Sequence, residues 1–374
     1  MCRRDNNNFI TINRLSRACI HALSRRSRII PGGVQMKHLI LLAGAVAAFG
    51  AGDNYHLVKK ISFGAAEGGR EYFDYINVDS AARRAYLSHG TEFLVVNLDT
   101  GALAGRVTGL KRDHGVALVP ELGRGYISDG DAAQIVIFDL KTFKTLGQIK
   151  GEQDADSIIY DPASKRVFVF NGDPNSATVI DPAMNKVLAT LPLGGAPEQA
   201  VADGRGMIYD NLEDKNEVIA IDSRTMKIKA RWPVAPGAQP VSMAMDRENR
   251  RLFIGCRNPK VFIVMDADTG KVIGKAFPIG ARVDSSIFDP ETKLAACSTG
   301  DGTIHIFHED SADAITAVQT VQTEFGAKTM ALDAKTHNLL VDTSDFESLA
   351  AAGKQKSSQP SAKPGTFRLL VYGR

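Results

Sequence analysis

A short apolar segment that ends in a turn recurs seven times between residues 76 and 333, and this repeat constrains the fold more than any other feature of the sequence. The seven copies end at Asp79, Pro120, Asp161, Asp203, Asp246, Asp289 and Asp333. Successive copies are 41 to 44 residues apart, which is the length of four short strands and their tight connections. The sequence therefore predicts an all-β fold, a seven-bladed β-propeller whose blades are four-stranded antiparallel sheets.

A second series of aspartates supports the same repeat. Its members are Asp99, Asp139, Asp181, Asp222 and Asp266, each at the predicted end of a third strand. Aspartate favours such turns because its side chain accepts hydrogen bonds from the backbone amides that follow it. We therefore expect the repeated Asp79, Asp161, Asp181 and Asp289 to cap turns rather than to take part in chemistry.

The two ends of the repeat array predict how the ring closes. The last repeat lacks a fourth strand of its own, and an unassigned strand at residues 56–64 precedes the first repeat. We expect this N-terminal strand to complete the last blade, because closure leaves no unpaired sheet edge at the seam. Residues 347–365 are rich in Ala, Lys, Ser and Pro, and they predict a flexible loop inserted in that blade.

The N-terminal residues predict export. Residues 36–51 begin at Met36, continue with a short apolar run and end in small residues suited to cleavage between Ala47 and Ala51, which is typical of a signal peptide. The run is too short to span a bilayer stably, so we expect a periplasmic or secreted protein without a membrane span in the mature chain. Residues 1–35 are then an upstream over-annotation or an arginine-rich targeting extension, and residues 52–374 form a single propeller domain.

The positive charge of the chain lies in the segment that export would remove. Residues 1–35 hold seven arginines and one acid, whereas the whole chain has a net charge of only +3. The body of the protein is therefore mildly acidic, which argues against nucleic acid as a partner. We expect a monomer.

Two cysteines, Cys256 and Cys297, belong to the predicted propeller. They lie on equivalent strands of consecutive repeats, one position out of step, so we expect their side chains to point to opposite sheet faces and to stay unbridged. The sequence alone leaves a disulfide open. It contains no CxxCH haem-attachment motif and no CxxC zinc spacing, so no cofactor is evident.

A family resemblance is carried by residues 166–203, RVFVFNGDPNSATVIDPAMNKVLATLPLGGAPEQAVAD, and by residues 251–280, RLFIGCRNPKVFIVMDADTGKVIGKAFPIG. These stretches resemble the YVTN β-propeller repeat family of YncE-like exported proteins. In that family a YVTN-type strand precedes a strand ending in IDxxTG, an outer strand and a GxxP-type loop. The resemblance covers residues 55–374 and implies an exported seven-bladed propeller, but it fixes no substrate.

The predicted strand order brings two kinds of loop together on one face of the ring, around the central channel. They are the loop before each innermost strand and the loop between the second and third strands, and this face is the default ligand site of a propeller. Seven residues stand five positions before the first anchors, at the predicted channel mouth: Asp74, Gly115, Asp156, Glu198, Val241, Asp284 and Lys328. The same face includes His89, Arg112, His114, Asn171, Arg257 and Arg282.

Two interpretations of the acidic residues at the mouth stay open. They form a solvated channel lining that pairs with neighbouring cations, or Asp156, Glu198 and Asp284 hold Ca²⁺ or a similar divalent cation, with Asn171 as a neutral ligand. Propeller lactonases use a channel metal to polarise a lactone carbonyl. In that case His114 is the candidate base.

The sequence favours binding over catalysis. We expect a non-enzymatic scaffold that binds a peptide, an envelope component or a small ligand at its channel face. The alternatives are a metal-assisted hydrolase of lactonase type and a propeller subunit of a redox complex.

Overall fold

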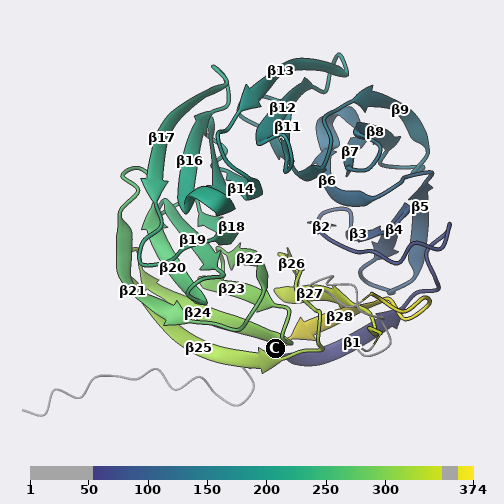
Figure 1. Cartoon of the computed structure of the whole chain (residues 1–374). Coiled ribbons are helices and arrows are strands. Elements are labelled where there is room, and N and C mark those ends of the chain that lie inside the picture. The colour runs from purple at the N-terminus through teal and green to yellow at the C-terminus, as the bar shows by residue number, and fades with distance from the viewer. Residues whose placement is uncertain (1–53, 348–360) are drawn as a thin grey trace, which may run out of the picture. The chain divides into compact units, whose positions relative to one another are not determined.

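Seven four-stranded antiparallel sheets form a ring in the computed structural model of the chain, which describes residues 54–347 and 361–374 (Figure 1). The first three blades, from the channel outward, are β2 (Ile76–Asp79), β3 (Arg84–His89), β4 (Glu92–Asn97) and β5 (Leu103–Thr108); β6 (Asp113–Val119), β7 (Arg124–Asp129), β8 (Gln134–Asp139) and β9 (Thr145–Lys150); β10 (Ala155–Asp161), β11 (Arg166–Asn171), β12 (Ser176–Asp181) and β13 (Lys186–Pro192). The predicted all-β, seven-bladed propeller is confirmed.

The remaining four blades follow the same order. They are β14 (Pro197–Ala202), β15 (Met207–Leu212), β16 (Glu217–Asp222) and β17 (Lys227–Pro233); β18 (Pro240–Asp246), β19 (Arg251–Cys256), β20 (Val261–Asp266) and β21 (Val272–Pro278); β22 (Val283–Asp289), β23 (Leu294–Thr299), β24 (Thr303–Ser311) and β25 (Ala314–Gln322); and β26 (Met330–Asp333), β27 (Asn338–Thr343), β28 (Arg368–Gly373) and β1 (His56–Ser62). Two short 3₁₀ turns occur at Pro120–Leu122 and Glu213–Lys215.

The N-terminal strand closes the ring, as predicted. Strand β1 pairs antiparallel with β28, from His56 opposite Gly373 to Ser62 opposite Arg368. Just before this strand, Tyr55 is buried and donates a hydrogen bond from its hydroxyl to the carbonyl oxygen of His337 at 2.8 Å. The last blade therefore has four strands like the others, and the seam leaves no unpaired inner edge.

Apolar clusters between neighbouring blades form the core. At the first interface, Tyr86 and Phe93 of the first blade pack with Ile127 and Phe138 of the second. The seam is packed in the same way, because Leu369 of β28 lies in one cluster with residues of the first blade. Burying a large apolar side chain contributes about 1.5–3 kcal/mol, so the interfaces between blades hold the ring together.

Side-chain caps stabilise the turns on the face of the ring opposite the predicted ligand face. The carboxylate of Asp181 accepts hydrogen bonds from the amides of residues 183 and 184, and Asp79, Asp161 and Asp289 bond the turns that follow them in the same way. The prediction of capping aspartates is thus confirmed for these four. The predicted end of a strand at Asp99 was wrong, because β4 ends at Asn97, whose Oδ1 accepts hydrogen bonds from the amides of residues 99 and 100.

Cys256 and Cys297 are both buried and free. The sequence analysis placed the two cysteines one position out of step on equivalent strands, whereas the structure places them two positions out of step. Arg251 and Leu294 occupy equivalent positions at the starts of β19 and β23, so Cys297 matches Ile254 and both thiols point towards the preceding blade. They lie in separate apolar clusters.

Among the described residues, no helical segment has the length and apolar character needed to cross a membrane. The predicted signal peptide and the extension before it lie outside the described residues, as does the middle of the predicted insertion at residues 347–365. Its described ends pair with each other, since Phe346 and Ala362 form an antiparallel bridge. The insertion therefore leaves and re-enters the blade at one place, next to the channel face.

Candidate functional site

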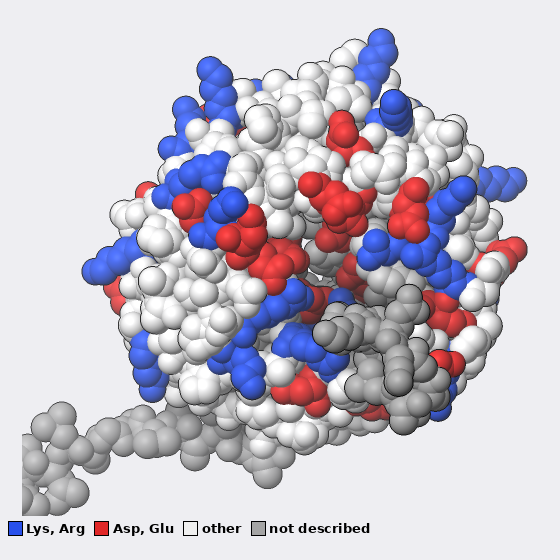
Figure 2. Space-filling model, viewed as in Figure 1, with Lys and Arg blue, Asp and Glu red and all other residues white. Residues whose placement is uncertain are grey.

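The channel face carries a cavity of about 530 Å³ built from the two kinds of loop that the sequence singled out. It is lined by Glu71, Tyr72, Phe73, Arg112, Arg257, Arg282, Asp284, Gly300, Phe325, Gly326, Lys328, Phe346, Ser361 and Ala362. Figure 2 shows basic and acidic side chains gathered around the opening at the centre of the ring. Four cations and four aromatic rings thus share one hollow.

Two arginines of the cavity lie against aromatic rings. The Arg282 guanidinium carbon is 4.5 Å from the centre of the Phe325 ring, and Phe325 meets Phe346 edge to face at 5.5 Å. On the other side, Arg112 lies 4.7 Å over the ring of Tyr72. Such stacking holds a guanidinium in one orientation while its edge stays available for hydrogen bonds.

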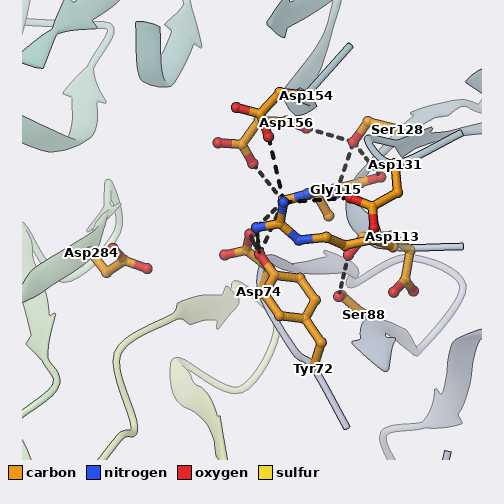
Figure 3. Close-up of polar contacts among 12 residues, drawn as sticks. Tyr72, Asp74, Ser88, Asp113, Gly115, Ser128, Asp131, Asp154, Asp156 and Asp284 are labelled. Atoms are coloured by element: carbon orange, nitrogen blue, oxygen red, sulfur yellow. Dashed lines mark hydrogen bonds and ion pairs between the residues drawn. The ribbon is translucent and has the colours of Figure 1, made fainter. Parts of the chain in front are cut away.

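A buried histidine joins the first three blades at the channel mouth. The Nδ1 atom of His114 lies 2.8 Å from Oδ2 of Asp74 and 2.9 Å from Oδ1 of Asp156. The Tyr72 hydroxyl donates to the same Asp74 oxygen at 2.7 Å. Figure 3 shows the side chains of Tyr72, Asp74 and Asp156 close together, the first two from the segment before β2 and Asp156 from β10. A Cβ at Gly130 would lie 3.0 Å from His114 Nε2, so this glycine leaves room for the ring.

These contacts set the protonation of the cluster. Burial alone would lower the pKa of His114, but hydrogen bonds to Asp156 and Asp74 raise it to about 10. Burial raises the pKa of Asp74, yet the charges of Lys328 and His114 outweigh it and hold that pKa well below its usual range. His114 is therefore a charged imidazolium at neutral pH, and Asp74 is ionised.

Ion pairs continue from Asp74 around the other side of the channel. Lys328 Nζ lies 3.5 Å from Asp74 Oδ1 and also contacts Asp284. The second oxygen of Asp284 accepts from Arg257 at 2.7 Å, and Arg257 in turn reaches Glu213 at 3.1 Å. Together with His114, these alternating charges connect all seven blades, from the third blade back through the first and seventh to the fourth.

The chain of ion pairs is open between the third and fourth blades. Glu198 lies there on β14 and has no ion pair or side-chain hydrogen bond within residues 54–347 and 361–374. Burial, with the nearby charge of Asp156, raises the pKa of Glu198 well above its usual value. Burial likewise raises the pKa of Asp156. Both carboxyls are thus poorer anions than exposed ones.

The structure places most of the predicted site residues together. Arg112, Arg257, Arg282, Asp284 and Lys328 line the cavity, and Asp74, His114 and Asp156 form the cluster beside it.

Two predicted residues lie elsewhere. His89 is buried in its blade, stacked at 4.4 Å on the ring of Phe367. Asn171 is buried with its amide nitrogen bonded to Ser176 and Thr178.

The proposed metal ligands are not brought together as a set. In the described part of the chain, the His, Cys, Asp and Glu atoms that could share one ion belong to Asp74, His114 and Asp156, all within 4.8 Å of one another. Asp284 is taken up by Arg257 and Lys328 instead. Because Asp74 and Asp156 already pair with the His114 imidazolium, and Asp74 also with Lys328, the geometry fits an ion-pair cluster better than a metal site.

The aromatic wall of the cavity was missed from the sequence. Tyr72 and Phe73 directly precede the channel-mouth residue Asp74, and Phe325 stands three residues before Lys328. The sequence pattern that could have predicted this wall is an aromatic residue in the loop before an innermost strand. Phe346 does not fit this pattern, because it follows a strand and precedes the insertion.

Comparisons with known proteins show the fold alone. No protein-family model and no curated protein matches the chain. Among solved structures, a chain of Kuenenia stuttgartiensis hydrazine synthase matches with a TM-score of 0.64 at 13% identity, over 71% of this chain and 91% of that one. The WD40 repeats of RRP9 match with a TM-score of 0.66 at 9% identity, over 83% and 99%, and U3-55K with 0.66 at 10%, over 82% and 97%. At such identities the likeness extends to the propeller architecture and no further.

Proposed function

We propose that this protein is an exported propeller of the YVTN-repeat type that binds a ligand in the cavity of its channel face and catalyses no reaction there. The observation that carries the proposal is the cavity of about 530 Å³, which falls in the size range of small-molecule sites. Three of its lining residues, Arg257, Asp284 and Lys328, belong to the ion pairs that connect all seven blades. A site supported by such a network is preorganised, which lowers the entropy cost of binding.

Ligand binding is tested by blocking the cavity. A small-fragment library is screened by ligand-observed NMR against the wild type, Ser361→Trp, which fills the cavity from its exposed edge, and Lys335→Trp, which adds the same ring on the opposite face. We expect a cluster of fragments that bind the wild type and Lys335→Trp but lose at least about tenfold in affinity with Ser361→Trp. Fragments that bind all three proteins equally, or none that bind at all, would contradict the proposal.

Export rests on the signal-peptide pattern of residues 36–51. When the full chain is produced in a host with a secretory pathway, we expect the exported protein to begin between residues 48 and 52. Intact mass and N-terminal sequencing of the exported fraction measure this. An uncleaved chain that stays in the cytoplasm would contradict the export proposal but not the proposal of a ligand site.

The alternatives have less support. A lactonase-type hydrolase needs a metal with open positions, whereas Asp74, Asp156 and Asp284 at the mouth already form ion pairs with His114, Lys328 and Arg257. A role in a redox complex finds no support in the likeness to a hydrazine synthase chain, which is limited to the fold.

A further inference from the structure

We propose that the cavity of the channel face takes an organic carboxylate with a flat apolar body, such as an aromatic acid. This inference rests on the proposed function and names the class of its ligand. It is carried by one guanidinium that has no acidic partner and by the exposed aromatic ring on which that guanidinium lies.

The charge of the cavity favours an anion. Its lining contains four cations and only two acids, Glu71 and Asp284, although the body of the protein is acidic overall. Arg257 and Lys328 are already engaged with Asp284. They therefore raise the positive potential of the cavity without being its first contact with a ligand.

Arg282 is the group best placed to bind that anion. Within the described residues it forms no ion pair, and its one side-chain hydrogen bond goes to the carbonyl oxygen of Gly300. Stacking on Phe325 and this bond fix the guanidinium from two sides. Its remaining N–H groups suit the paired oxygens of a carboxylate, which arginine binds with two parallel hydrogen bonds.

The aromatic residues favour a flat apolar body next to that carboxylate. Phe325 is 50% exposed, which is unusual for so large an apolar side chain, and it faces the same cavity as Phe346 and Phe73. A ring placed against Phe325 would cover this surface and gain the offset or edge contacts that aromatic pairs prefer. The volume of about 530 Å³ admits a ligand of two fused rings.

Isothermal titration with three probes of one shape tests the class: 2-naphthoate, the neutral 2-naphthalenemethanol and the cation 2-naphthylmethylammonium. We expect naphthoate to bind roughly tenfold or more tightly than the alcohol and the ammonium to bind most weakly. Arg282→Gln should weaken naphthoate by about 10- to 100-fold and leave the alcohol within about twofold. Arg205→Gln removes the same charge from an exposed turn on the opposite face and should change nothing.

The outcomes separate this inference from the proposed function. Equal affinity for the three probes, equal effects of Arg282→Gln and Arg205→Gln, or no probe binding would overturn the aromatic-carboxylate class. Fragments blocked by Ser361→Trp would still support a ligand site. The C-terminus of a peptide ending in phenylalanine carries the same chemistry, so acetyl-Gly-Phe is compared with its amide. Tighter binding of the free acid than of naphthoate would identify a peptide end as the source of that carboxylate.

Discussion

A chain that begins at Phe63 instead of Asn54 is expected to melt on the order of 10 °C lower. The deletion removes β1 and with it the whole pairing with β28 along the seam. It also removes Tyr55, whose buried ring lies in an apolar cluster with residues of the sixth and seventh blades. The last blade would be left with three strands and an open edge, which exposes backbone groups and invites pairing with other molecules. Thermal unfolding followed by circular dichroism measures the difference.

Two substitutions separate loss of the strand from loss of one side chain. Tyr55→Phe removes only the hydrogen bond to His337 and should cost about 1 kcal/mol. Tyr55→Ala leaves a cavity and should cost about 3–5 kcal/mol, an effect between those of Tyr55→Phe and the deletion. If the shortened chain melted at the temperature of the chain starting at Asn54, ring closure by β1 would have no part in stability.

The architecture was predictable because it depends on features that repeat along the sequence at short range. Strand length, turn residues and repeat length depend on neighbours in the chain, and each blade repeats them. The errors arose where one residue type stands in for another. Asn97 caps its turn as an aspartate does in other blades. The series of repeated aspartates therefore placed the end of this strand at Asp99, two residues beyond its actual end. At β23 every residue is buried, so no alternation of apolar and polar side chains fixed the register of Cys297.

The position of the site was predictable from the sequence, but the ion pairs formed by its side chains were not. Counting five residues back from the anchors found the mouth of the channel, since that offset is again local. The partners are not local, because Asp74 meets His114 of the next blade and Lys328 at the far end of the chain. Which acid pairs with which cation depends on how the blades pack around the ring. The same reason explains why Asp284 was expected to bind a metal and instead lies between two cations.

Side-chain direction limited the prediction at the rim. His89 and Asn171 each end the second strand of a blade, where one position decides whether a side chain faces the loop or the sheet. His89 lies against the ring of Phe367, and Asn171 bonds the next strand of its own hairpin. Both therefore support the blades from inside, and neither lines the cavity.

Replacing His114 with glutamine is expected to lower the free energy of unfolding by about 3–5 kcal/mol at neutral pH. The imidazolium lies between Asp74 and Asp156 and pairs with both, and without it Asp156 loses its ion pair and Asp74 keeps only the one to Lys328. His308→Gln is the matched control, because His308 also contacts a carboxylate, that of Asp310 at 2.7 Å, but at the surface. The control should cost less than about 1 kcal/mol. Urea unfolding of the three proteins measures the differences.

The pH dependence of that difference identifies the charge of His114 as its cause. The pKa of His114 rises on folding from 6.5 to about 10, so folding is coupled to proton binding by this residue. Its contribution is therefore complete below about pH 6.5 and is lost as the pH rises through about 10. The gap between the wild type and His114→Gln should then be widest near pH 6 and close towards pH 10. A gap of constant size across this range would mean that packing around the ring, and not the ion pairs that join the blades, accounts for the loss.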